Sequence, residues 1–315
     1  MIDTRVQIVS RPTAADSAAI LTLVEAATDV DGAAPLSEHV LLHLQHGGDV
    51  ADEHVLIWSG ERLVAYGHLD TSDRVAGASG EIVVHPEFRR HGFGSMLITT
   101  LVERSRDGRL RLWAHGAQPA AVALAQRLGF RRTRTLWQMR RSLLSPMPAP
   151  DLPAGVTIRN FEVGRDEQRW LDVNNRAFAK HPEQGRWTID DLRMREAESW
   201  FDPAGFFLAE RAGGIIAFHW TKVHGSVEHE GHEHPPIGEV YVVGVDPSAQ
   251  RLGLGTAMTL VGLRYLRARG LAQVMLYVDD DNAGAIAIYE SMGFIRWDSD
   301  ATFTKDDPPA DSSRG

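Results

Sequence analysis

Two segments have the residue types and the spacing that bind a pyrophosphate. Residues 89–94 read Arg-Arg-His-Gly-Phe-Gly, and residues 250–255 read Gln-Arg-Leu-Gly-Leu-Gly. Glycine lets a ligand approach the backbone closely, and the N–H groups at the start of a following helix attract anions. A dinucleotide-binding fingerprint would need a third glycine, and a Walker loop would need Gly-Lys-Ser/Thr. One such segment alone would more often be an ordinary turn, whereas two copies favour a phosphate site.

The two segments belong to a long internal repeat. Pro86, Gly92 and Gly94 recur 161 residues later, and the Gly-Phe of residues 129–130 recurs 164 residues later. A repeat of this length indicates a tandem of whole domains, which agrees with roughly 150 residues per domain in a chain of 315. Four prolines within residues 146–155 predict a stiff linker. We therefore expect domains at 1–145 and 156–304, a linker at 146–155 and a disordered tail at 305–315.

Strands and helices alternate within each half. In the second half, strands are expected at 206–211, 214–224, 239–245 and 273–278. Helices are expected from about Gly253 and at 282–292, with Gly293 as the C-cap of the second one. In the first half, Phe93, Met96, Leu97 and Leu101 follow helical spacing and predict one buried face. The fold class is therefore α/β of the α+β type, with a mixed sheet in each half.

Composition limits the possible functions. The chain has 33 basic and 42 acidic residues, a net charge of −9, and 43% hydrophobic residues. No global positive field exists to hold a nucleic acid or an anionic membrane, so neither is expected as a partner. Cysteine is absent, which excludes disulfides, thiolate metal sites and a cysteine nucleophile. No apolar run approaches the length of a membrane span, and we expect a soluble, cytoplasmic protein.

With these loops, the chain resembles the GCN5-related N-acetyltransferase (GNAT) family in tandem. In that family the loop binds the pyrophosphate of acetyl-CoA, the preceding strand pairs with the pantetheine arm, and the sheet splays open beyond it. The resemblance implies acetyl-CoA as co-substrate and no metal. The cofactor-binding residues implied in the first half are Ile82, Val83, Val84, Arg90, His91, Gly92, Phe93, Gly94 and Ser95. Those implied in the second half are Val243, Gly244, Val245, Gln250, Arg251, Leu252, Gly253, Leu254, Gly255, Thr256, Asn282, Ala283, Gly284, Ala285, Ile286 and Ala287.

A narrower resemblance covers nearly the whole chain. Residues 113–116, 174–185, 200–205, 218–224 and 238–247 are similar to the mycothiol synthase family, two-domain GNAT enzymes of actinobacteria. Those enzymes acetylate the cysteinyl amine of cysteinyl-glucosaminyl-inositol, the last step of mycothiol synthesis. The small amino-sugar thiol substrate rests on this resemblance alone, and a monomer is expected. Two alternatives remain open: an acetyltransferase for another amine, such as an antibiotic or a protein N-terminus, and a non-catalytic acetyl-CoA sensor.

Acetyl transfer needs a deprotonated amine and a proton for the departing thiolate. An α-amino group titrates near 8, so a modest base suffices at neutral pH. The resemblance makes Glu239 this base, acting through water; the rival reading is an edge-exposed residue at a strand start. Strand alternation would place Tyr241 and Val243 on the face of Glu239. The pair Glu239 and a proton donor would also argue against the sensor.

The expected proton donor is Tyr289, which the resemblance places beside the CoA sulfur; the rival reading is a packed core tyrosine. The repeat offsets place Ala125 opposite Tyr289 and Ala78 opposite Glu239. Neither alanine can move a proton. The first half is therefore expected to bind acetyl-CoA without turning it over.

The remaining candidates concern the acceptor. Glu183 and Lys222 match residues that contact it in the family, as does Glu239, and Glu38 matches a further contact. Glu38 is equally well explained as an acid in the first turn of a helix. Tyr277 would line the cofactor channel or belong to the core. Residues 224–236 hold four histidines and three glutamates, which suit zinc or nickel but lack helical pairing, so a solvated loop is expected.

Overall fold

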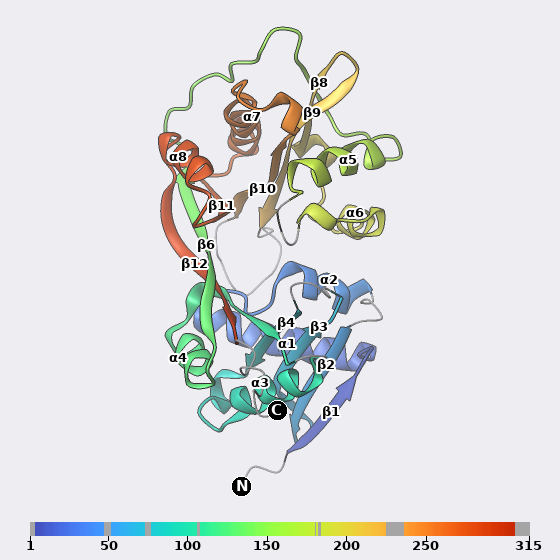
Figure 1. Cartoon of the computed structure of the whole chain (residues 1–315), viewed down its shortest axis with the longest axis vertical. Coiled ribbons are helices and arrows are strands. Elements are labelled where there is room, and N and C mark those ends of the chain that lie inside the picture. The colour runs from blue at the N-terminus through green and yellow to red at the C-terminus, as the bar shows by residue number, and fades with distance from the viewer. Residues whose placement is uncertain are drawn as a thin grey trace, which may run out of the picture. The chain divides into compact units, whose positions relative to one another are not determined.

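The chain folds into two compact units. The computed structural model describes residues 4–46, 52–72, 77–105, 108–179, 181, 184–224 and 236–305. The first unit comprises Met1–Trp137 with Asp298–Gly315, and the second comprises Gln138–Trp297. Each unit is a mixed sheet with helices on both faces (Figure 1), which confirms the expected fold class.

The first unit is built on the sheet order β1-β2-β3-β4-β5-β12. The pairing is antiparallel except between β4 and β5, which run parallel. In chain order the first half of the sequence forms β1 (Arg5–Val9), α1 (Ala14–Asp31), α2 (Glu38–His46), β2 (Asp52–Ser59), β3 (Arg62–Asp70), β4 (Ala78–Val84), η1 (Pro86–Phe88), α3 (Phe93–Arg104), β5 (Leu110–Ala114), η2 (His115–Ala117), α4 (Pro119–Arg127) and β6 (Arg131–Ser142).

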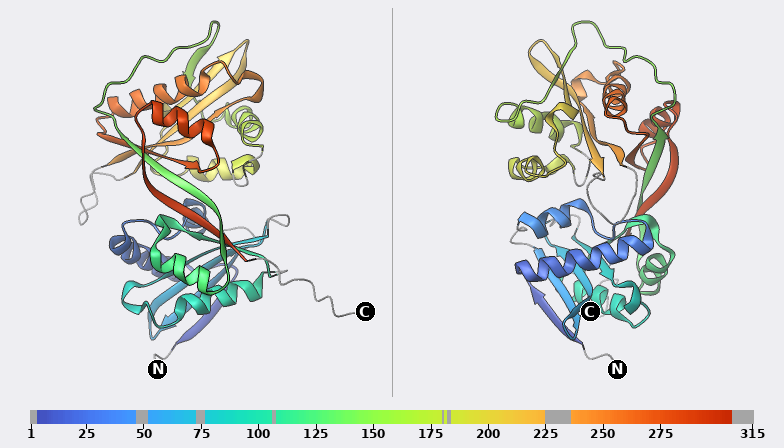
Figure 2. Two further views of the ribbon diagram at one scale, coloured as in Figure 1. Left: turned by 60° about the vertical axis from the view of Figure 1, so that its left-hand side comes forward. Right: turned by 180° about the vertical axis from the view of Figure 1, so that it is seen from behind.

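Two apolar layers cover this first sheet. α1 and α2 pack on one face through a cluster that includes Ile20, Leu23 and Tyr66. α3 and α4 lie on the other face (Figure 2), where Leu97 and Ala125 belong to one apolar cluster. The buried residues of α3 are Phe93, Leu97, Ile98 and Leu101, as its spacing predicted except at one position. Met96 is 42% exposed and not part of the expected face.

The second unit repeats this plan with the sheet order β6-β11-β10-β9-β8-β7. The second half of the sequence forms β7 (Thr157–Asn160), α5 (Glu167–Ala177), η3 (Gln184–Arg186), α6 (Ile189–Glu196), η4 (Pro203–Gly205), β8 (Phe206–Arg211), β9 (Gly214–His224), β10 (Ile237–Val245), η5 (Pro247–Ala249), α7 (Leu254–Ala268), β11 (Gln273–Asp279), α8 (Ala283–Ser291) and β12 (Ile295–Thr304). α5 and α6 cover one face around Trp170 and Trp220, whereas α7 covers the other through Leu254 and Met258.

Each half of the sequence supplies a strand to the other unit. The end of β12 pairs antiparallel with β5 from Ala301↔Ala114 to Thr304↔Arg111 and so completes the first unit. The end of β6 lies beside β11 in the second unit, where Leu143 N donates to the oxygen of Ala272 at 2.8 Å. The boundary of the compact units therefore falls at Trp137 and again at Trp297, and not at residues 145 and 304 as the sequence suggested.

Several local expectations can also be compared with the structure. Residues 146–155 form neither helix nor strand, as their prolines predicted. The C-cap of α8 is Met292, and Gly293 follows it with φ +85°, so the expected cap is one residue out. The expected tail from residue 306 and the histidine-rich segment 225–235 lie outside the described residues.

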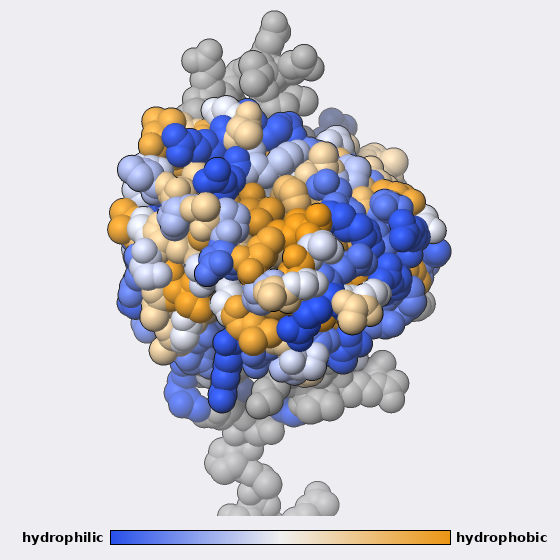
Figure 3. Space-filling view, turned by 90° about the horizontal axis from the view of Figure 1, so that it is seen from above, coloured by the Kyte–Doolittle hydropathy of each residue, from blue (hydrophilic) through white to orange (hydrophobic). Residues whose placement is uncertain are grey.

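Neither the helices nor the apolar side chains on the surface define a further site among the described residues. Among the described residues, no helix combines the length and the apolar character that crossing a membrane requires. On the face of the molecule in Figure 3, apolar side chains gather between hydrophilic ones. Large exposed apolar residues include Leu144, Val163 and Leu252. Apolar atoms form much of any protein surface, so this exposure alone defines no site.

Candidate functional site

The loop before α7 has the backbone shape of an anion cradle. Arg251 and Gly253 both have positive φ angles, 65° and 76°. No side chain caps the N-terminus of α7, where Gly253 is the N-cap residue. Alternating left-handed residues turn successive N–H groups to one side, and an uncapped helix start adds more of them. The loop therefore offers several N–H groups to a phosphate.

The loop before α3 repeats this geometry. Arg90 and Gly92 have φ angles of 69° and 90°, and α3 also lacks a side-chain cap. One glycine differs between the loops. A Cβ on Gly94 would lie 2.8 Å from Leu124 Cδ2, whereas a Cβ on Gly255 would meet nothing closer than Val245 at 3.9 Å. Gly94 therefore also serves the packing of α3 on α4, while the space above Gly255 stays open.

Both sheets splay apart next to these loops. β10 and β11 pair only at Gly238↔Val274 and Glu239↔Met275 within the described residues. β4 and β5 likewise pair only from Ala78↔Leu110 to Gly80↔Leu112. Beyond these points, the cofactor residues expected at 82–84 and 243–245 pair on one edge with β3 and β9. Their other edge is open to the amides of an extended ligand.

A β-bulge in β10 changes the expected alternation. The register with β9 runs Val240↔Thr221 and then Val242↔Trp220, which skips Tyr241. Tyr241 and Val242 consequently pack into the same cluster, and Val243 packs into the cluster on the opposite face. The expectation that Glu239, Tyr241 and Val243 share a face is therefore wrong, because the bulge adds one residue to the strand.

The same bulge corrects the expected match between the halves. β4 and β3 pair without a register shift from Ser79↔Asp70 to Val84↔Ala65. Counting back from the end of each ladder across the extra residue, Glu239 aligns with Ser79 and not with Ala78. The parallel pairs Glu239↔Met275 and Ser79↔Arg111 agree with this alignment.

Glu239 is a buried carboxylate beside a histidine and a lysine. It is 7% exposed, pairs across the strands with Lys222, and lies 2.5 Å from His224, from Oε2 to Nε2. Burial raises the pKa of Glu239, but the hydrogen bond and charge of His224, together with Lys222, outweigh it and hold the pKa below its usual value. Glu239 is therefore ionised at neutral pH, and the reading as an edge-exposed residue does not apply.

His224 is the residue that the sequence analysis missed. It was considered only as one of four histidines in a polar segment, whereas it ends β9 directly beside Glu239. Its side chain is 35% exposed, so it connects a buried carboxylate with solvent. The sequence contained a signal for it: Lys222 and His224 alternate along one strand, and residues at i and i+2 share a face.

Tyr289 lies in the last turn of α8, partly buried against Phe294 with ring centroids 5.8 Å apart. Burial raises the pKa of its phenol to about 12, so the hydroxyl stays protonated. The expected match to Ala125 agrees with the backbone, because Phe294 N bonds to Tyr289 O and Phe130 N bonds to Ala125 O, each at 3.0 Å. At the other end of α8, Asn282 caps the helix by accepting from Ala285 N.

The residues expected to contact the acceptor substrate or the cofactor channel lie on several different elements. Lys222 is 8% exposed, with Nζ 4.2 Å from the ring centroid of Trp200 and 5.2 Å from that of Tyr241. Tyr277 is 39% exposed on β11, and its hydroxyl accepts from Gln138 Nε2 at 2.8 Å. Glu38 is the first residue of α2 in the first unit. Glu183 lies outside the described residues.

A groove opens beside this group. It has a volume of about 770 Å³ and lies beside residues 221–224 of β9, which extend past the first residue of β8 and pair only with β10 among the described strands. Its lining mixes aromatic, cationic and acidic side chains, among them Trp200, Asp202, Lys222, His224, Tyr265 and Arg269. A polar, uncharged or zwitterionic small molecule would find hydrogen-bond donors, acceptors and an apolar wall there.

Comparisons with known proteins agree with this geometry. The model of the acetyltransferase (GNAT) family matches residues 22–130 and 169–294. The mycothiol acetyltransferase of Acidothermus cellulolyticus is 55% identical, covering 91% of this chain and 90% of its own length. That of Thermomonospora curvata is 56% identical, with 92% and 93% covered. The chain belongs to the mycothiol acetyltransferase group of the GNAT family.

The tandem arrangement has a solved counterpart. A tandem GNAT protein from the clavulanic acid biosynthesis pathway superposes with a TM-score of 0.71 at 19% identity, covering 98% of this chain and all of that one. This likeness concerns the fold, and it agrees with one GNAT domain in each half. As a GNAT acetyltransferase, the chain uses an acyl-CoA as its acyl donor.

Proposed function

We propose that the chain transfers the acetyl group of acetyl-CoA to the cysteinyl amine of cysteinyl-glucosaminyl-inositol, the last step of mycothiol biosynthesis. Relatives more than half identical along nearly the whole chain carry the name mycothiol acetyltransferase. The observation that carries the chemistry is the contact between the buried Glu239 and the partly exposed His224, beside the point where β10 and β11 part. The second unit performs the transfer, and the first binds acetyl-CoA without turning it over.

The second unit binds acetyl-CoA along β10 and the following loop. The pyrophosphate lies on the N–H groups of residues 250–256, where two left-handed residues and an uncapped helix start face it. The amides of the pantetheine arm pair with the open edge of residues 243–245. Asn282–Ala287, at the start of α8, border the far side of the cofactor.

Glu239 acts as the general base. The amine nitrogen attacks the thioester carbon, and the proton it loses passes to Glu239, directly or through one water. Because the pKa of Glu239 is held below its usual value, the carboxylate is ready to accept a proton over the whole neutral range. His224 then offers a route to solvent, since it contacts Glu239 on one side and is partly exposed on the other.

Two groups stabilise the developing negative charge. The bulge at Tyr241 takes one residue out of the ladder with β9, and a backbone N–H of this strand, near residues 243–245, polarises the thioester carbonyl. Tyr289 donates its hydroxyl hydrogen to the CoA sulfur as the carbon–sulfur bond breaks. A phenol with a pKa of about 12 is a weaker acid than a thiol near 8.5, so Tyr289 keeps its proton and stabilises the departing thiolate by a hydrogen bond, and solvent water protonates the thiolate.

The acceptor occupies the groove beside β9. Its inositol and glucosamine hydroxyls require both donors and acceptors, which Asp202, Lys222 and Arg269 provide. Lys222 is fixed between Trp200 and Tyr241, so it is positioned before the acceptor arrives. Glu183 and Glu38 are further proposed contacts, and Tyr277 is a proposed neighbour of the cofactor.

The test is a mass-spectrometric acetylation assay with acetyl-CoA. The purified chain is offered cysteinyl-glucosaminyl-inositol beside an aminoglycoside antibiotic and a peptide with a free N-terminus, at equal concentrations. We expect kcat/KM for the cysteinyl substrate to exceed the others by at least about 100-fold, because buried polar groups penalise a substrate that leaves them unpaired. A preference for either competitor would reject the acceptor and leave only an acetyltransferase.

A further inference from the structure

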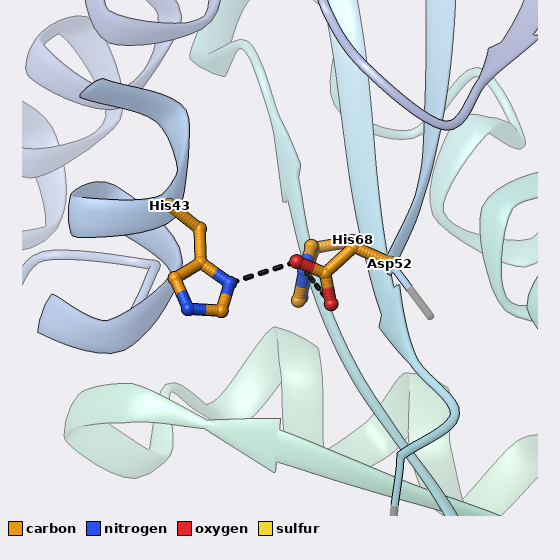
Figure 4. Close-up of side chains that lie close together, drawn as sticks. All are labelled: His43, Asp52 and His68. Atoms are coloured by element: carbon orange, nitrogen blue, oxygen red, sulfur yellow. Dashed lines mark hydrogen bonds and ion pairs between the residues drawn. The ribbon is translucent and has the colours of Figure 1, made fainter. Parts of the chain in front are cut away.

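Three buried side chains with metal-binding atoms meet in the first unit, far along the sequence from the catalytic pair. His43 comes from α2, Asp52 begins β2, and His68 lies in β3 (Figure 4). One nitrogen of each histidine and one oxygen of the aspartate all lie within 4.8 Å of one another. His43 Nδ1 is 2.7 Å from Asp52 Oδ2, and His68 Nε2 is 3.5 Å from Asp52 Oδ1. The two carboxylate oxygens therefore face one imidazole each.

One nitrogen in this group of His43, Asp52 and His68 is buried without a hydrogen bond among the described residues. His68 is only 2% exposed, yet its Nε2 atom has no hydrogen-bond partner among the described residues. This nitrogen points to the carboxylate at a distance too long for a good hydrogen bond. A buried polar atom left in this state costs free energy unless something else occupies the space in front of it.

We propose that His43, Asp52 and His68 bind one divalent transition-metal ion of the zinc class. Imidazole nitrogen and carboxylate oxygen are ligands that zinc accepts, with bonds of about 2.0–2.2 Å. Tetrahedral bonds of that length hold the donor atoms roughly 3.3–3.5 Å apart. With one carboxylate oxygen as the ligand, the three donor atoms already lie within 4.8 Å of one another, so each pair needs to move by no more than about 1.5 Å. A water molecule completes the four ligands.

The surroundings fit such an ion. His54, which pairs with His68 across the strands, uses its Nδ1 atom on the hydroxyl of Tyr66 at 2.7 Å. It therefore packs beside the ligands, with its ring 5.3 Å from that of His68, and is not itself a ligand. The ion would join α2 to β2 and β3, so it would stabilise the folded first unit. Its role is structural, because none of the three ligands belongs to the proposed catalytic machinery.

The test uses cobalt(II) and zinc(II) with the full chain after chelator treatment. The histidine-rich segment is a competing ligand, so the reference variant carries His229→Ala, His232→Ala and His234→Ala together. We expect this reference to bind one equivalent of cobalt(II) with the visible absorption of a four-coordinate site, and zinc(II) to displace it. Addition of His68→Asn should weaken zinc binding by at least about 100-fold, because a ligand is lost.

A matched control separates ligand loss from a general disturbance of the core. His54→Asn removes an equally buried imidazole two residues from Asp52 and should leave the equivalent of cobalt(II) bound. Zinc(II) should raise the thermal midpoint of the reference and of His54→Asn, but not that of His68→Asn. Absence of one-to-one binding in the reference at about 10 μM metal, or equal binding in His68→Asn, would overturn the proposal. Both outcomes can be read without measuring acetyl transfer.

Discussion

The two units have opposite kinds of side chain at equivalent positions of their sheets. Counted from the end of each ladder, three neighbouring strand positions of the second unit are buried and apolar: Phe206, Trp220 and Val242. The same positions of the first unit are buried and ionisable: His54, His68 and Glu81. The second unit thus has an apolar wall beside its catalytic pair, whereas the first has a row of buried ionisable side chains that need polar partners.

A histidine and a glutamate meet in both units, but only one pair is arranged for proton transfer. In the first unit, His115 lies between Asp300 at 3.1 Å and Glu81 at 3.6 Å. Burial alone would lower the pKa of His115, but Asp300 and Glu81 raise the pKa to about 10, and the pKa of Glu81 falls to about 2. A proton held this firmly is unavailable near neutral pH. The comparison teaches that a His–Glu contact alone does not indicate catalysis.

The largest expected effect follows from removing the catalytic groups of the second unit. Glu239→Gln and Tyr289→Phe should each lower kcat by about 10²–10⁴, the usual contribution of a general base or acid. Acetyl-CoA affinity, measured by calorimetry, should change little because neither residue belongs to the phosphate loop. Ser79→Ala is the matched control in the first unit and should leave kcat within about twofold. An equal loss in Ser79→Ala would erase the distinction between the units.

A smaller effect should come from His224→Gln. Without this imidazole, burial is less well compensated and the pKa of Glu239 rises. The carboxylate then stays protonated to a higher pH, so the acidic limb of kcat/KM should move upward. The loss should therefore grow as the pH falls below neutral and reach roughly 10-fold on the acidic limb. A rate that falls by the same factor at every pH would reject the role of His224 in tuning Glu239.

The buried group of His115, Glu81 and Asp300 in the first unit should make the stability of the fold depend on pH without affecting acetyl transfer. The raised pKa of His115 stabilises the fold fully below about pH 6.5, and this contribution disappears as the pH rises toward 10. The lowered pKa of Glu81 stabilises it above about pH 4.5, with loss as the pH falls toward 2. Thermal midpoints should therefore fall on the alkaline side, and Asp300→Asn should flatten that decline. An unchanged alkaline slope in Asp300→Asn would contradict the assignment.

Much of this asymmetry could be predicted from the sequence, because it lies in short local patterns. The glycine spacing identified both loops, since a left-handed backbone before an uncapped helix requires residues such as Gly92 and Gly253. The lack of a second proton donor could likewise be predicted, because the first half has Ala125 at the position that Tyr289 occupies in the second. Glu239 was found through the family resemblance, and its burial agrees with the proposed role as a base.

The remaining features depend on contacts between distant segments. The bulge at Tyr241 left no trace in the pattern, because Val240, Val242 and Val243 are apolar on either alignment. The exchange of β6 and β12 could not be foreseen, since a strand at the end of a repeat pairs equally well within its own half. The trio around Asp52 comes from three separate elements, and only the fold brings its members together.

The central claim is that both units hold acetyl-CoA and only the second uses it, and one pair of matched variants tests this directly. Ser95 and Thr256 occupy the same position in the first turns of α3 and α7. Glutamate at either position is favourable for the helix but repels the phosphates. Acetyl-CoA sites and turnover are measured on the same preparations by calorimetry and mass spectrometry.

We predict that Ser95→Glu reduces the bound acetyl-CoA from two equivalents to one and leaves kcat within about twofold, whereas Thr256→Glu also reduces it to one but abolishes most turnover. If Ser95→Glu instead lowers kcat as far as Thr256→Glu, with its remaining site still occupied, the first unit takes part in the reaction and the account is wrong.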